Sequence, residues 1–320
     1  MRRSIFILIT SILITEDLFG DSFTYNSFNN HGVIGLINTP SARFYDDSSF
    51  GITFYNGDPV QKLTMTSFPY NWMEASFFYT NINGLPYCTV QYDPVCKQDY
   101  KDKGFNFKFR LKEEGVFPSI ALGINDIAGT GLFSSEYIVA SYGINKTDFH
   151  FGIGWGTLDG SKYSFKNPLG YVHDSFKSRP TETADRGGQF QPSRYFSGKG
   201  ASPFFGLSHA LNEKTILKIE HDTTSATGRI NYSQPKKNYT IGLDYSINNN
   251  FTIGVSSEKD SNISIKFIYK NDPLSETGRF RPKKAYPKEG DNKYTKLIKN
   301  LNANNIGVDS IIETPDFIGL

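Results

Sequence analysis

The chain has 320 residues with 34 basic and 32 acidic side chains, which gives a formal net charge of +2 at pH 7. This balance provides no basic surface for nucleic acid, and the mean hydropathy of −0.41 excludes a bundle of membrane-spanning helices. The 19 Tyr and 27 Phe residues, beside 29 Gly, are typical of many short aromatic strands separated by turns.

The N-terminus follows the pattern of a secretory signal. Arg2 and Arg3 precede an apolar run of twelve residues, which is too short to cross a bilayer as a helix. We therefore predict a signal peptide over 1–20, with a buried first strand as the alternative. The residues that follow, 21–47, are expected to form a segment that leads into the folded domain.

Strict alternation of apolar and polar residues recurs along the chain, as in Phe105–Leu111, where the apolar side chains share one face. Such segments predict twelve strands, an even number as in bacterial outer-membrane barrels. Most are close to the length that a tilted strand needs to cross a bilayer. The predicted strands cover 48–57, 61–68, 70–80, 102–112, 117–125, 134–143, 147–156, 201–210, 214–222, 237–247, 251–257 and 261–270.

Short and long connections alternate between these strands. The connections on one side are short and lie at Pro69, 113–116, 143–146, 211–213 and 248–250. All the long ones, at 81–101, 125–134, 157–200 and 223–236, fall on the other side. Short periplasmic turns and long external loops are typical of outer-membrane barrels.

These patterns predict an all-β fold: a 12-stranded antiparallel transmembrane β-barrel over 48–271. We expect it in the cell outer membrane, in contact with lipid, with both barrel termini in the periplasm. A soluble β-sandwich or closed soluble barrel also alternates and is the alternative.

Charges of both signs lie on one face of the predicted strands. They would be untenable in a dry core, but they suit a wet lumen or the outside of a soluble sandwich. We interpret them as the polar lining of a polymer path, with mutual pairing that plugs the lumen as the alternative. These residues are Glu74, Lys108, Arg110, Glu136, Lys218, Glu220, Asp244 and Lys266.

Two further features suggest contacts at the lumen and at its mouth. Gly152 and Gly154 share the lumen face, so they leave room for another backbone, for which 35–43 is the natural candidate. Arg43 would then pair with Glu74 or Glu136. In addition, the loop 157–200 could stack on sugar rings, with a mobile loop without a ligand as the alternative. Its aromatic residues are Tyr163, Phe165, Tyr171, Phe176, Phe190, Tyr195 and Phe196.

No arrangement of residues indicates catalysis. The chain has neither Gly-x-Ser-x-Gly nor His-Glu-x-x-His, and its 5 His are scattered. We expect no catalytic residues, no metal site and no cofactor. The two cysteines, Cys88 and Cys96, lie in one polar stretch, and in an exported chain they predict a disulfide that closes a surface loop.

The residues after the barrel differ in composition from it. A linker rich in Pro and charge covers 272–292, and the following residues place Leu297, Ile298 and Leu301 on one helical face. A strand-like run comes next. We therefore predict a partial periplasmic α/β segment over 293–320, that is, a short C-terminal α+β element, with a frayed tail as the alternative.

The motif GLINTPSAR at 35–43 includes Gly35, Asn38, Pro40 and Arg43. Together with segments at 68–76, 100–105, 126–137 and 152–156, it resembles the YjbH-like family of outer-membrane exopolysaccharide and capsule biosynthesis proteins, over roughly 30–272.

This resemblance implies a non-enzymatic part in the secretion or assembly of exopolysaccharide or capsule. The implied partners are a polysaccharide and periplasmic assembly proteins, and not nucleic acid. The rival functions are a general or substrate-selective channel and a structural surface protein that anchors extracellular matrix.

Overall fold

The computed structural model describes residues 26–87, 98–180, 190–225, 237–259, 262–272, 312–313 and 318–319. The predicted signal peptide, Cys88 and Cys96, and the helical part of the predicted C-terminal segment lie outside these residues. The chain divides into two units after Asn271. In the second unit, the described residues are β14 (Ile312–Glu313) and β15 (Ile318–Gly319), which pair antiparallel.

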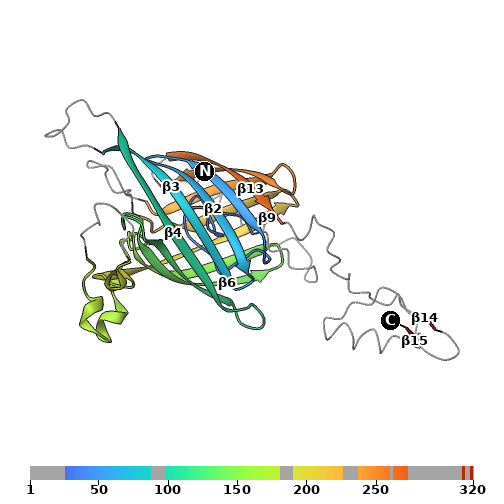
Figure 1. Cartoon of the computed structure of the whole chain (residues 1–320), viewed down its shortest axis with the longest axis horizontal. Coiled ribbons are helices and arrows are strands. Elements are labelled where there is room, and N and C mark those ends of the chain that lie inside the picture. The colour runs from blue at the N-terminus through green and yellow to red at the C-terminus, as the bar shows by residue number, and fades with distance from the viewer. Residues whose placement is uncertain are drawn as a thin grey trace, which may run out of the picture. The chain divides into compact units, whose positions relative to one another are not determined.

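The first unit is a closed barrel of twelve antiparallel strands, as predicted. Each barrel strand pairs with the next one along the chain, and β1 pairs with β13 to close the ring. A two-residue strand, β8 (Phe165–Lys166), pairs with β9 beside the ring. Figure 1 shows the strands side by side around the barrel. They are β1 (Phe50–Asn56), β2 (Val60–Tyr70), β3 (Met73–Pro86), β4 (Asp99–Lys112), β5 (Ser119–Ile127), β6 (Ser135–Ile144), β7 (Thr147–Gly156), β9 (Gly200–Asn212), β10 (Thr215–His221), β11 (Tyr239–Ser246), β12 (Phe251–Glu258) and β13 (Asn262–Asn271).

The largest difference from the predicted strands is at β3, which was expected at 70–80 and extends to Pro86. Its polar continuation pairs with the start of β4, because Pro86 lies opposite Asp99. The turn expected at Pro69 is also wrong: Pro69 lies within β2, and the chain turns at 71–72. A register shift after Ser67 accommodates a proline, which has no N–H for the ladder.

Side chains alternate between a polar lumen face and an apolar outer face. In β11, Thr240 and Asp244 are buried, whereas Ile241 and Leu243 are 49% and 46% exposed. Tyr70 and Trp72 stack at the end of β2, with ring centroids 5.2 Å apart. An apolar outer face with aromatic side chains at its rim, around a charged interior, is the pattern of a transmembrane barrel. The soluble sandwich is therefore excluded.

The two ends of the barrel differ in their connections. At one end, termed the short-turn end, the strands are joined by two to six residues. Phe50 and Asn271, the first and last residues of the barrel strands, pair at this end. The other end, termed the long-loop end, carries the connection from β7 to β9, drawn in yellow-green at the left of Figure 1.

The β7–β9 connection contains three short 3₁₀ helices among its described residues. They are η1 (Pro168–Tyr171), η2 (Asp174–Phe176) and η3 (Pro192–Arg194). No helix in the described part of the chain is long and apolar enough to cross a membrane.

Candidate functional site

The segment before β1 folds into the lumen of the barrel. We term residues 27–44 the plug; within it, 32–42 are all buried. Two isolated bridges, Phe28 to Ile34 and Gly35 to Pro40, shape it into compact loops. Its apolar side chains pack against lumen-facing side chains of the wall, so the hydrophobic core of this unit lies inside the barrel. The core residues are Phe28, Ile34, Ala42, Phe44, Phe68, Ala121, Tyr137, Val139, Leu158, Phe204 and Ile268.

Lysines on the wall bind the carbonyl oxygens of the plug. Buried backbone groups need hydrogen-bond partners, and bonds to a charged donor are the stronger kind. Three lysines of the predicted lumen set supply these bonds. The contacts run from Lys108 Nζ to the oxygens of Ile34 (3.2 Å) and Arg43 (2.8 Å), from Lys218 Nζ to those of Gly35 (2.9 Å) and Leu36 (2.8 Å), and from Lys266 Nζ to that of Phe28 (2.9 Å).

The same lysines pair with carboxylates of the wall. Lys108 Nζ lies 2.6 Å from Glu74 Oε2, and the side chains of both are at most 1% exposed. Lys218 and Lys266 share Asp244, at 2.9 and 3.0 Å. Each buried charge is thus compensated twice, by an opposite charge and by the plug.

Glu220 binds three consecutive N–H groups of the plug. Its carboxylate accepts hydrogen bonds from the backbone nitrogens of Ile37, Asn38 and Thr39 at 3.1, 2.7 and 3.1 Å. The Thr39 hydroxyl adds a bond of 2.6 Å. Successive N–H groups that converge in this way form an anion-binding nest. Here the nest belongs to the plug and the anion to the wall.

The side chain of Asn38 joins the plug to two more wall carboxylates. Its Nδ2 lies 2.8 Å from Asp222 Oδ2 and 2.8 Å from Glu258 Oε2. Asn30 Nδ2 also donates to Glu258, at 2.9 Å. The motif residue Asn38 therefore holds the tip of the plug near the long-loop end.

Arg43 holds the plug at the short-turn end. Its Nε and Nη2 make a bidentate pair with Asp148 at 2.8 and 2.6 Å, and Nη2 lies 2.5 Å from Glu114. The partners expected from the sequence, Glu74 and Glu136, are wrong. Glu74 is bound by Lys108 instead, and Glu136 lies on the other side of the wall.

We expect Arg43→Ala to lower the free energy of unfolding by about 3–5 kcal/mol, because the buried carboxylate of Asp148 would lose the guanidinium that compensates its charge. Lys177→Ala is the control. It lies outside the lumen and its partner Asp174 is 86% exposed, so its loss should be small. Urea unfolding in lipid vesicles measures the free energy of unfolding of both variants. An equal decrease in the two variants would contradict the role of Arg43 in holding the plug.

Glu136 does not line the lumen, contrary to the prediction. It lies in register with Trp155, one position out of phase with the lumen residues of β6, so its side chain is on the outer face. The β7–β9 connection covers it there. Arg179 pairs with it at 2.9 and 2.7 Å, and the backbone N–H of Phe196 donates to it at 2.8 Å. A one-residue error in phase moves a side chain to the opposite face.

The room beside Gly152 and Gly154 is not occupied by the plug, contrary to the prediction. A Cβ at Gly152 would lie 2.2 Å from the Phe204 ring, and one at Gly154 would lie 2.4 Å from Leu158 Cβ. The plug instead approaches a glycine of β9. A Cβ at Gly206 would lie 2.5 Å from Leu36 Cδ1.

Lys62 is a further buried cation in the lumen. Its Nζ lies 3.2 Å from His31 Nδ1 and 4.5 and 4.1 Å from the ring centroids of Phe78 and Phe133. Burial, and then the charge of Lys62, lower the pKa of His31. Because an ammonium group can only donate, Nδ1 of His31 accepts the hydrogen bond from Lys62, and the two aromatic rings add cation–π attraction.

Seven of the eight residues predicted for the lumen face it: all except Glu136. The sequence reading missed other charged residues on the same face. Their signal was the same alternation, since each lies in phase with lumen residues of its strand or directly follows them. The missed residues are Lys62, Asp102, Asp148, Asp222 and Glu258.

Small cavities lie beside the plug within the lumen. Two cavities of about 40 and 90 Å³ lie at its tip, and both are lined by His31 and Asn38. Within the described ranges, no group of three or more His, Cys, Asp or Glu residues could hold a metal ion.

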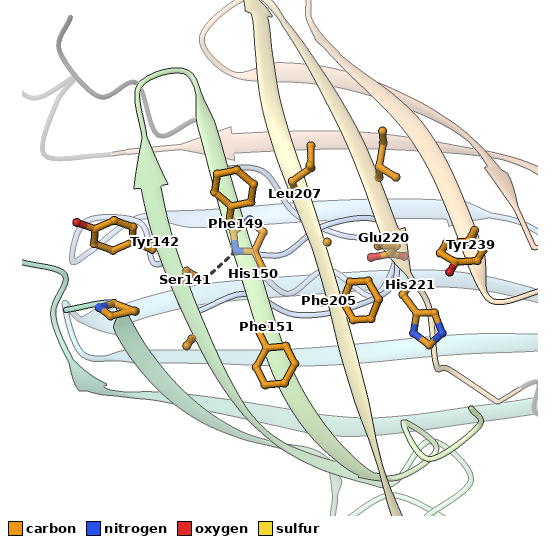
Figure 2. Close-up of a pocket in the computed structure, with 14 residues that line it drawn as sticks. Ser141, Tyr142, Phe149, His150, Phe151, Phe205, Leu207, Glu220, His221 and Tyr239 are labelled. Atoms are coloured by element: carbon orange, nitrogen blue, oxygen red, sulfur yellow. Dashed lines mark hydrogen bonds between the residues drawn. The ribbon is translucent and has the colours of Figure 1, made fainter. Parts of the chain in front are cut away.

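The outer face carries an apolar groove of about 410 Å³ over β6, β7, β9 and β10. Figure 2 shows Phe149, Phe151 and Phe205 along it, with the hydrogen bond of 2.8 Å between Ser141 and His150 dashed. Because this surface faces lipid, acyl chains are its natural covering.

A closed antiparallel barrel with an apolar outer face and a charged, filled lumen is a transmembrane β-barrel of the outer-membrane type. The chain belongs to the YjbH family: the family model described as exopolysaccharide biosynthesis protein YbjH matches residues 27–311. The resemblance noted in the sequence is therefore confirmed.

One curated relative is the uncharacterized lipoprotein YjbH of Escherichia coli (strain K12). It is 31% identical over 242 residues, which are 73% of this chain and 33% of the relative. The chain thus spans about a third of the length of this relative.

Among solved structures, similarity extends to a KdgM porin in complex with disordered oligogalacturonate, at 8% identity and a TM-score of 0.39 over 70% of this chain and 98% of that chain. The NanC porin is 10% identical, with a TM-score of 0.37 over 70% of this chain and 99% of that chain. The barrel assignment itself rests on the strand pairing.

Proposed function

We propose that this chain is a non-enzymatic outer-membrane barrel that takes part in exopolysaccharide or capsule secretion or assembly, and that its plug closes the lumen at rest. Membership of a family described by exopolysaccharide biosynthesis carries the proposal. The geometry supports the closed state, because cavities of about 40 and 90 Å³ are smaller than the roughly 300–1,000 Å³ of ligand pockets. A sugar chain can therefore enter the lumen only after the plug moves.

We place the short-turn end, with both barrel termini, in the periplasm. Short periplasmic turns and longer external loops are the rule in outer-membrane barrels. In this orientation, 1–20 is the export signal, 21–47 enters the barrel from the periplasm, and the linker 272–292 and segment 293–320 remain there. Arg43 then lies at the mouth that periplasmic assembly proteins can reach.

We expect the purified protein to show no steady conductance in planar lipid bilayers, because the plug fills the lumen. A general porin of the same strand number, measured in the same bilayers, is the control. Steady open conductance comparable to that porin would contradict a closed resting state and would favour the general channel.

The proposed role is tested by deleting the gene in the source organism and measuring cell-retained and released polysaccharide. We expect polymer to be retained in the deletion strain, and release to return when the wild-type chain is expressed. An unchanged amount and distribution of polymer would contradict a role in secretion or assembly.

A further inference from the structure

The β7–β9 connection forms an open pocket at the long-loop end, separate from the lumen. Its volume is about 830 Å³, and its lining comes from β8, from η1 and η2 with the residues beside them, and from the two residues that precede β9, Gly198 and Lys199. This volume lies within the range of small-molecule sites. The pocket is distinct from the plug contacts on which the proposed closed state rests.

The shape of this pocket is set by one buried side chain, Asn167. Its Oδ1 accepts hydrogen bonds from Trp155 Nε1 at 2.9 Å and from the Leu169 N–H at 3.1 Å. Its Nδ2 lies within hydrogen-bond distance of three carbonyl oxygens, one at the end of η2 and two in the turn before β9. They are those of Phe176 (2.9 Å), Phe196 (2.9 Å) and Gly198 (3.2 Å).

Contacts with the barrel wall hold the same connection in place. Trp155, in β7, packs edge-on against Phe196 with centroids 5.3 Å apart. Arg179 and Glu136 add a buried ion pair at 2.7 Å. The described part of the connection is therefore a fixed surface, and a binding site on it loses little conformational entropy when a ligand arrives.

The lining of the pocket is rich in positive charge. Lys166 lies opposite Gly200 in the β8–β9 pair, and the carbonyl oxygen of Lys199 accepts a bond of 3.1 Å from the next backbone N–H, that of Asn167. Both lysines line the pocket, one on each of the two chain segments that meet at the end of the β8–β9 pair. Among the described residues, neither has an ion-pair partner. Lys177 also lines the pocket and pairs with Asp174 at 2.5 Å, the single acidic residue of the lining.

An exposed aromatic ring lies in the same lining. Tyr171 is 81% exposed, although a ring of this size usually buries most of its surface. Aromatic faces stack on the C–H faces of sugar rings, and the phenol hydroxyl can bond to a sugar hydroxyl. Ammonium groups beside such a ring suit a sugar that carries carboxylates.

We infer that this pocket binds a carboxylate-bearing saccharide, with Lys166 and Lys199 pairing with the carboxylates and Tyr171 stacking on a sugar ring. The site would let the long-loop end hold an acidic polymer. The inference rests on the proposed role only for the biological source of that polymer, since the binding itself is a property of the purified chain.

The test compares two hexamers with the same linkage that differ only at C6 of each sugar: a β-1,4-linked glucuronate hexamer, with carboxylates, and cellohexaose, with neutral hydroxymethyl groups. Titration calorimetry of the purified full chain in lipid nanodiscs is expected to show binding of the glucuronate hexamer at low salt and at least about tenfold weaker binding of cellohexaose. Raising the salt concentration should weaken the binding of the hexamer, because solvent-exposed charges are screened.

Variants of the pocket locate the site. K166A/K199A should bind the hexamer about 25-fold more weakly, at about fivefold for each of the two lost exposed charge pairs. K166R/K199R should retain most of the affinity, and Tyr171→Ala should weaken the binding of both hexamers. Lys162→Ala with Lys214→Ala is the control, since both lysines are exposed and lie outside the pocket.

Three results would overturn the inference. They are equal affinity for the two hexamers, wild-type affinity in K166A/K199A, and binding only when lipopolysaccharide is present in the nanodisc. Because the readout is binding in vitro, a failure here leaves the secretion experiment unaffected, and a failure of that experiment leaves this result standing.

Discussion

Lys108→Ala combined with Lys218→Ala is expected to release the plug while the barrel remains folded. Each substitution leaves a buried carboxylate, Glu74 or Asp244, without one of its cations, and it also removes two bonds to plug carbonyls. Breaking one buried pair costs about 3–5 kcal/mol. The strand ladder does not depend on these side chains, so the loss falls on the plug.

Conductance in planar bilayers measures this release. We expect the double variant to show open steps that the wild type lacks, and trypsin to cut after Arg43, whose carbonyl oxygen Lys108 binds. Lys103→Ala with Lys214→Ala is the matched control, because both lysines are exposed. A closed pore with a protected Arg43 in the double variant would show that the lumen charges do not hold the plug.

Glu220→Ala is expected to loosen the tip of the plug without opening the short-turn end. It leaves three backbone N–H groups and one hydroxyl without their acceptor, at about 1–3 kcal/mol for each buried group. Glu220→Gln keeps one acceptor oxygen and nearly the same volume, so a smaller loss is expected.

Hydrogen exchange measured by mass spectrometry reports on this tip directly. In Glu220→Ala, protection of the amides at 37–39 should fall by at least about a hundredfold. Arg43 should stay resistant to trypsin, because Lys108 still binds its carbonyl oxygen and Asp148 still binds its side chain. Glu213→Ala, an exposed glutamate in the β9–β10 turn, is the control. Unchanged protection of the amides at 37–39 would contradict the bonds to Glu220 as the main contacts that hold the tip of the plug.

The lumen charges illustrate why a face can be predicted more readily than a role. Alternation correctly places Lys108, Lys218 and Lys266 toward the lumen, where they were interpreted as a polymer path. The structure shows that they bind the plug instead. The entry of 35–43 into the lumen was predicted as well, but beside Gly152 and Gly154. The bonds between its backbone and the wall lysines were not predicted.

The errors in the candidate site arose where local pattern and tertiary contact differ. Glu136 lies at the start of β6, where too few residues precede it for the alternation to show which face it is on. Its side chain lies on the outer face, where the β7–β9 connection buries it. Gly152 marks a close approach as expected, but a side chain of the adjacent strand, Phe204, fills the space.

The sequence by itself determined the barrel. Period-two alternation separates the two faces of each strand locally, and short turns make neighbours along the chain pair antiparallel, so neither feature needs distant contacts. Only the tertiary structure decided which groups meet inside. Asn38 and Glu220 are 182 residues apart, and no local pattern encodes that contact. It forms because a buried backbone must find hydrogen-bond partners, and in this lumen the charged wall provides them.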